Sequence, residues 1–124
     1  MVKNQFVESQ TSTGAAGAAD TLTVTVGAGE YIAVTGIQIY RAVAGAEAAG
    51  AVLVITTTGL PTGLAWTVGN LVAAGTTVKD VDMTFDVPLV STAPGTNVTI
   101  VCPNPGTTPV WNTRIFFYRT RLTF

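Results

Sequence analysis

The sequence contains no histidine and only one cysteine, Cys102, in 124 residues. Without histidine this chain cannot assemble Ser/His/Asp or Cys/His catalytic groups, and it lacks the commonest metal ligand in proteins. A lone cysteine forms neither an internal disulfide nor a C-x-x-C metal motif. Its apolar neighbours Ile100 and Val101 predict a buried, inert thiol. We therefore expect a protein that is not an enzyme and carries no cofactor.

Charge is also scarce. Only 10% of the residues are charged, against about 25% in an average globular domain. The chain has no basic run that would bind nucleic acid or a membrane surface. It also has no apolar stretch of the roughly 20 residues that cross a bilayer, and residues 1–6 do not resemble a signal peptide. We expect a soluble protein made in a cytoplasm, whose weakly charged surface is either covered by neighbours in an assembly or simply a Thr-rich β surface.

What the chain has in abundance is period-2 alternation of β-branched residues, which predicts strands. In segment 20–26, Leu22, Val24 and Val26 share one face and threonines share the other. Segment 30–42 changes phase at Thr35-Gly36, so we expect a β-bulge there that returns both apolar pairs to the core. The other expected strands are 51–58, 64–71, 77–89, 98–102 and 110–124, with a further extended piece around Phe6.

Seven or eight strands separated by Gly/Pro turns predict an all-β fold, an antiparallel two-sheet sandwich with little or no helix. Periodicity does not distinguish a jelly roll from an immunoglobulin-like sandwich, because it does not specify the strand order. We expect residues 1–19 to form an N-terminal arm and edge strand, with a flexible arm or loop from Ser9 to Ala19. Residues 20–124 should form the sandwich. Residues 42–50, rich in alanine and glycine, are expected to form a loop.

Segment 77–89 carries candidate site residues. Alternation predicts Val81, Met83, Phe85 and Val87 on one face, with Asp80, Asp82, Thr84 and Asp86 on the other. Asp80 and Asp82 could share a calcium ion, but no loop of the calcium-binding kind is present. Paired carboxylates also suggest a glycosidase, although no aromatic cleft is evident. We favour a solvated or interfacial acidic face and no metal.

The last segment combines Arg114, Arg119 and Arg121 with aromatic residues. Such mixtures occur in protein interfaces and in single-stranded nucleic-acid sites. By alternation, Arg119 and Arg121 share a face with Trp111, Ile115 and Phe117, and Arg114 shares the opposite face with Phe116 and Tyr118. We favour core packing for the aromatic residues and interface salt bridges for the arginines.

The second half of the chain resembles small jelly-roll proteins of tailed bacteriophages. The resemblance follows a small-small-Gly stretch, an alternating strand, Pro-Leu, a Gly-Thr strand and an aromatic last strand. These are residues 73–76, 81–85, 88–89, 95–100 and 114–119. The resemblance implies a sandwich of jelly-roll type. It also implies a capsid decoration (cement) protein that binds the major capsid protein on the outer surface of the virion, commonly as a homotrimer. It implies no catalytic residues.

Two other functions remain open. A tail or fibre module would bind the host surface instead of the capsid. A carbohydrate-binding module would need Trp66, Trp111 or tyrosines exposed together on one face.

Overall fold

A computed structural model describes residues 7–43, 52–61, 64–69 and 76–121. This part of the chain contains no helix and eight strands. They are β1 (Glu8–Thr13), β2 (Asp20–Val24), β3 (Tyr31–Val43), β4 (Val52–Thr58), β5 (Ala65–Gly69), β6 (Thr76–Val90), β7 (Val98–Cys102) and β8 (Val110–Thr120). The expected Ala/Gly-rich loop at 42–50 lies almost entirely outside the described residues. No helix long and apolar enough to cross a membrane occurs in the described ranges.

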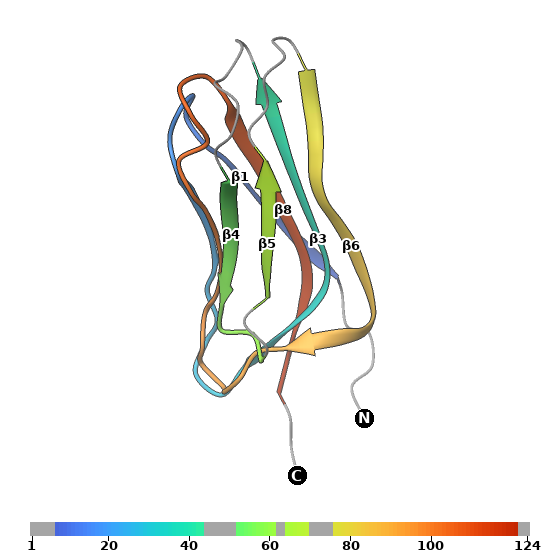
Figure 1. Ribbon diagram of the computed structural model, residues 1–124. Coiled ribbons are helices and arrows are strands. Elements are labelled where there is room, and N and C mark those ends of the chain that lie inside the picture. Colours follow the sequence, from blue (N-terminus) through green and yellow to red (C-terminus); the bar gives the residue numbers. More distant parts are fainter. Residues whose placement is uncertain (1–6, 44–51, 62–63, 70–75, 122–124) are drawn as a thin grey trace.

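The strands form two four-stranded antiparallel sheets, which we call sheet A and sheet B. Sheet A has the order β1-β8-β3-β6, and sheet B has the order β2-β7-β4-β5. Strand 1 therefore pairs with 8, 2 with 7, 3 with 6 and 4 with 5, as when one long hairpin is rolled into two layers. This is the jelly-roll connectivity. The expected all-β sandwich is confirmed, and Figure 1 shows β4 and β5 of sheet B in front of β8 and β3 of sheet A.

A bulge in β3 lies where the change of phase predicts it. The pairing of β3 with both neighbours shifts between Val34 and Gly36. Ile32 and Val34 before the shift, and Ile37 and Ile39 after it, are all fully buried. Because the extra residue restores the side-chain phase, one strand of 13 residues contributes two apolar pairs to the same core.

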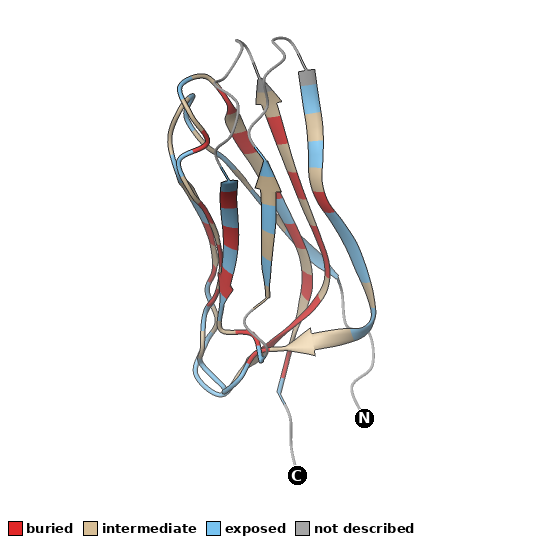
Figure 2. Cartoon of the chain, viewed as in Figure 1, coloured by how far each residue is buried: buried red, intermediate tan, exposed pale blue. Residues whose placement is uncertain are grey.

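The core lies between the sheets and is built from alternate residues of six strands, a pattern that Figure 2 shows clearly on β4. Trp111 is its largest fully buried side chain. The Trp111 indole Nε1 donates a hydrogen bond to the Pro103 carbonyl oxygen at 2.8 Å, which satisfies the one polar atom of this ring. Trp66, Phe85 and Leu89 are partly buried and pack against this core.

The N-terminal segment differs from the expectation in part. Residues Glu8–Thr13 form edge strand β1 and pair with β8 along its whole length, so the prediction of a flexible arm or loop is wrong for residues 9–13. β1 lies at the edge of sheet A. Residues 14–19 form the connection to β2, and the Gly14 and Gly17 amides donate to the carbonyl oxygens of Trp111 and Pro109. Tertiary hydrogen bonds therefore order a segment whose composition predicts a loop.

Candidate functional site

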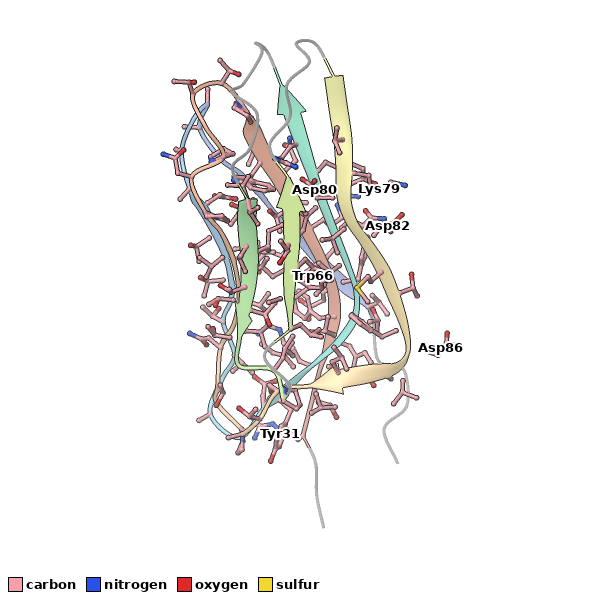
Figure 3. All side chains as sticks on the ribbon, in the orientation of Figure 1. Tyr31, Trp66, Lys79, Asp80, Asp82 and Asp86 are labelled. Atoms are coloured by element: carbon pink, nitrogen blue, oxygen red, sulfur yellow. The ribbon has the colours of Figure 1, made fainter. Side chains whose placement is uncertain are left out.

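The acidic strand β6 contains a second bulge, at Asp80. Tyr40 of β3 pairs with Lys79 and Ile39 pairs with Val81, so Asp80 has no partner of its own. A bulged residue is re-aimed relative to the alternation of its strand. Asp80 consequently points between the sheets, while Asp82 and Lys79 lie on the outer side of β6 (Figure 3).

Asp80 meets Arg41, a buried arginine of β3. The Arg41 Nε and Nη2 atoms donate to the two carboxylate oxygens at 2.6 and 2.8 Å, and the side chains are 1% and 3% exposed. Arg41 Nη2 also donates to the Gly69 carbonyl oxygen at 2.8 Å. The guanidinium lies 5.2 Å from the centroid of the Trp111 ring, which adds a cation–π contact.

These contacts correct the assignment of the acidic face. Asp80 does not share a face with Asp82 and Asp86, and its carboxylate is used inside the molecule. The calcium hypothesis is wrong for the same reason, because the carboxylates of Asp80 and Asp82 point to opposite sides of the strand. No group of three or more acidic or cysteine side chains within the described ranges is placed to hold a metal ion.

The other two acidic candidates are exposed. Asp82 forms an ion pair with Lys79 at 3.1 Å. The hydrogen bond from Lys79 lowers the pKa of Asp82, and the same contact raises the pKa of Lys79. Asp86 points away from the body of the molecule at the bend of β6 (Figure 3). Val87, expected on the core face, is 79% exposed. It is one of the residues 85–88 of β6 that have no partner on β3 where the register between the two strands shifts.

Of the three candidate arginines, Arg114 and Arg119 occupy the faces of β8 that alternation predicts. Arg119 lies beside buried Phe117 and is tied within the chain, by an ion pair to Glu8 at 3.1 Å and a hydrogen bond to the Thr25 carbonyl oxygen at 2.7 Å. Arg114 is exposed on the opposite face, with its guanidinium 5.9 Å from the centroid of the Phe116 ring. Arg121, after β8, is exposed. A role of these arginines in an interface stays a prediction.

Neither tryptophan provides an exposed sugar platform. Trp111 is fully buried. Trp66 packs against the core, and its Nε1 points to the sulfur of Met83 at 3.3 Å. The two rings are therefore not exposed together on one face, as a carbohydrate-binding module that uses its tryptophans would require.

Cys102 is fully buried, as expected, and lies 3.7 Å from the Thr113 hydroxyl. Burial raises the pKa of the thiol to about 11. The thiolate, which is the reactive form, is therefore disfavoured at neutral pH.

A feature that the sequence pattern did not reveal is the outer face of sheet B, on which none of the residues that the structure describes is charged. We call this surface the neutral face. It consists of Thr21, Thr23, Val52, Val54, Thr56, Thr58, Ala65, Thr67, Gly69, Thr99 and Val101, which alternate with core residues on the four strands.

The charged residues of the described ranges lie on sheet A, between the sheets, or in the turns and ends of the sandwich. The neutral face is nevertheless exposed. Val52 and Val54 are 66% and 46% exposed, and on its two central strands the hydroxyls of Thr58 and Thr99 bond to each other. The sequence signals were the alternating threonines of 21–25 and the three consecutive threonines of 56–58. Only the strand order shows that they share one surface.

The fold thus belongs to the class of eight-stranded jelly-roll sandwiches. No family model matches the chain, and no curated protein matches it. Among solved structures, the chain is similar to one determined by cryo-EM, the virus-like particle of extra small virus from the giant freshwater prawn Macrobrachium rosenbergii. The match has 13% sequence identity and a TM-score of 0.39, and it covers 95% of this chain and 81% of the other. Similarity at this level carries no argument about function.

Proposed function

We propose that this chain is a structural protein of a viral particle, a capsid decoration protein whose neutral face adheres to the head shell. The observation that carries the proposal is that no described residue on the exposed outer face of sheet B is charged. Soluble domains normally intersperse both signs of charge over their surfaces. The cores of protein interfaces are instead depleted of charge, because burying an unpaired charge is unfavourable.

The partner and the location rest on the sequence resemblance to phage decoration proteins, which is an analogy at the level of fold and pattern. By that analogy, the chain binds the major capsid protein on the outer surface of the virion and assembles as a homotrimer. A trimer that contacts the shell at several points gains affinity from effective concentration even when each contact is weak. The function is mechanical, and no catalytic step is invoked.

Thr56 offers a direct test because it is exposed on central strand β4 of the neutral face. We expect Thr56→Lys to reduce binding to purified shells at least about tenfold, since the interface would bury an unpaired ammonium group. Co-sedimentation with purified shells measures the binding, and mass spectrometry of the particles gives the copy number of the chain per particle. Thr84→Lys is the matched control, because Thr84 is an exposed threonine on sheet A. Equal binding by both variants, or a wild-type protein that stays monomeric and binds no shell, would contradict the proposal.

The alternative of a tail or fibre module predicts binding to host cells and no binding to shells. The same two variants separate it from decoration when cells replace shells in the assay.

A further inference from the structure

The outer face of sheet A, opposite the neutral face, contains a shallow polar groove of about 360 Å³. Two rows of side chains cross it, because residues of β1, β8 and β3 lie directly opposite one another in the register. The first row is Thr11, Arg114 and Gln38, and the second is Thr13, Asn112 and Tyr40. Rows two residues apart along a strand are separated by about 7 Å.

These side chains offer a particular set of contacts. Gln38 and Asn112 provide amides, and Thr11 and Thr13 provide hydroxyls. The Gln38 Nε2 donates to Asp82 at 3.4 Å and the Thr13 hydroxyl donates to the Asn112 Oδ1 at 3.2 Å, which leaves the Gln38 Oε1 to accept from a ligand and the Asn112 Nδ2 to donate to one. Tyr40 adds an aromatic ring of intermediate exposure. A mixture of amides, hydroxyls and an aromatic ring matches a ligand with many hydroxyl groups and apolar ring faces. The volume lies at the lower end of the range for ligand sites.

Charge narrows the class of ligand. Lys79 and Asp82, which continue the two rows on β6, pair with each other. Arg114 is the remaining charge in the groove, and within the described part of the chain its guanidinium forms no ion pair. A single guanidinium group is suited to one carboxylate, which it can bind with two parallel hydrogen bonds. It does not suit a polyanion, because nucleic-acid binding depends on several phosphate contacts.

We propose that this groove binds an acidic saccharide, with a carboxylate of the sugar on Arg114 and its hydroxyls on Gln38, Asn112 and the threonines. The proposal is independent of the shell-binding role, since the two surfaces belong to different sheets. A subunit bound to the shell through the neutral face would have the groove on its outward side. There the groove could contact acidic polysaccharides of a cell surface.

The test uses two acidic probes, oligogalacturonate and sialyllactose, each with its methyl ester as a neutral analogue of the same shape. Titration of the full chain, followed by calorimetry and by NMR chemical-shift mapping, is expected to show saturable binding of at least one acid. The shifts should concentrate on β1, β8 and β3. Esterification of that probe and the Arg114→Ala substitution should each weaken binding roughly tenfold or more.

Tyr40→Ala should weaken binding as well, and Tyr31→Ala is its matched control. Both tyrosines lie on β3 with intermediate exposure, but only Tyr40 lines the groove. Arg114→Lys keeps the charge and loses the bidentate fork, so its affinity should fall between those of wild type and Arg114→Ala. Circular dichroism establishes that each variant is folded.

The proposal is overturned if neither acid binds, or if binding is unchanged by esterification and by Arg114→Ala. It is also overturned if a single-stranded oligonucleotide displaces the saccharide and binds more tightly, which would assign the groove to nucleic acid. The shell-binding assay with Thr56→Lys tests a residue of sheet B, whereas the groove lies on sheet A. Failure of one proposal is therefore distinguishable from failure of the other.

Discussion

Arg41 and Asp80 form a buried bidentate ion pair that joins β3 to edge strand β6, with N–O distances of 2.6 and 2.8 Å. The pair exists because the bulge turns Asp80 inward at the level of Arg41. The pair and the Trp111 ring lie together between the sheets. A charge placed so deep is tolerated only with its partner present.

We therefore expect Asp80→Ala to lower the free energy of unfolding by about 3–5 kcal/mol, because it leaves a buried guanidinium without its carboxylate. Urea denaturation followed by circular dichroism measures the change. The double variant Arg41→Met/Asp80→Leu should recover most of the loss, since it replaces both charges with apolar groups. A single variant as stable as wild type would show that the pair is not important for stability.

The β3 bulge predicts an effect of chain length. Deleting Thr35 removes the extra residue and moves every later side chain of β3 to the opposite face, which would expose Ile37 and Ile39. We expect the deletion variant to lose cooperative unfolding and near-ultraviolet circular dichroism. Thr35→Ala keeps the length and should stay within about 1 kcal/mol of wild type. Equal behaviour of the two variants would contradict this account of the bulge.

Substitutions at Gly59 and Gly95 distinguish the cost of a positive φ from the cost of a steric clash. Both have positive φ, 84° and 77°. A Cβ at Gly59 would overlap the Asn97 carbonyl oxygen, whereas a Cβ at Gly95 meets nothing within 4 Å. Gly95→Ala should be destabilised by about 1–2 kcal/mol from conformation alone, and Gly59→Ala by clearly more. Thermal unfolding of the two variants provides the comparison, and the reverse order would refute it.

Cys102 predicts a loss of stability at alkaline pH. The folded-state pKa of about 11 lies above the ordinary value of 9.0. Between these values the unfolded chain binds fewer protons than the folded chain. The thiol's stabilising contribution is therefore complete below pH 9 and is lost as the pH rises toward 11, by up to a few kcal/mol.

The stability difference between wild type and Cys102→Ala should accordingly shrink from pH 8 to pH 11. Unfolding in urea at a series of pH values measures it, and the paired comparison cancels the titration of lysines and tyrosines. Thiol labelling of the wild type at pH 8 should proceed only as fast as the chain unfolds. Rapid labelling of the folded protein would indicate an accessible thiol.

The sequence by itself determined the strands and the core face of most of them. Period-2 alternation is a local property, so Leu22 and Val24 could be placed on one face of their strand without any knowledge of their neighbours. In the last segment aromatic residues alternate onto both faces, so the pattern did not decide which face is buried. The bulge at Thr35-Gly36 was also readable, because two apolar pairs out of phase on one strand cannot otherwise both be buried. Arg41 lies in the same phase as Ile37 and Ile39, a signal for a buried charge that the sequence reading did not use.

Only the tertiary structure decided how the strands combine. The bulge at Asp80 depends on the register between β3 and β6, which alternation within one strand does not specify, and so the acidic face was assigned wrongly. The neutral face and the polar groove each collect residues from strands far apart in the chain. Which strands are neighbours is set by the rolling of the hairpin into two sheets. The physical reason is that periodicity fixes which way a side chain points relative to its own strand, while a surface is defined by the strands that lie beside it.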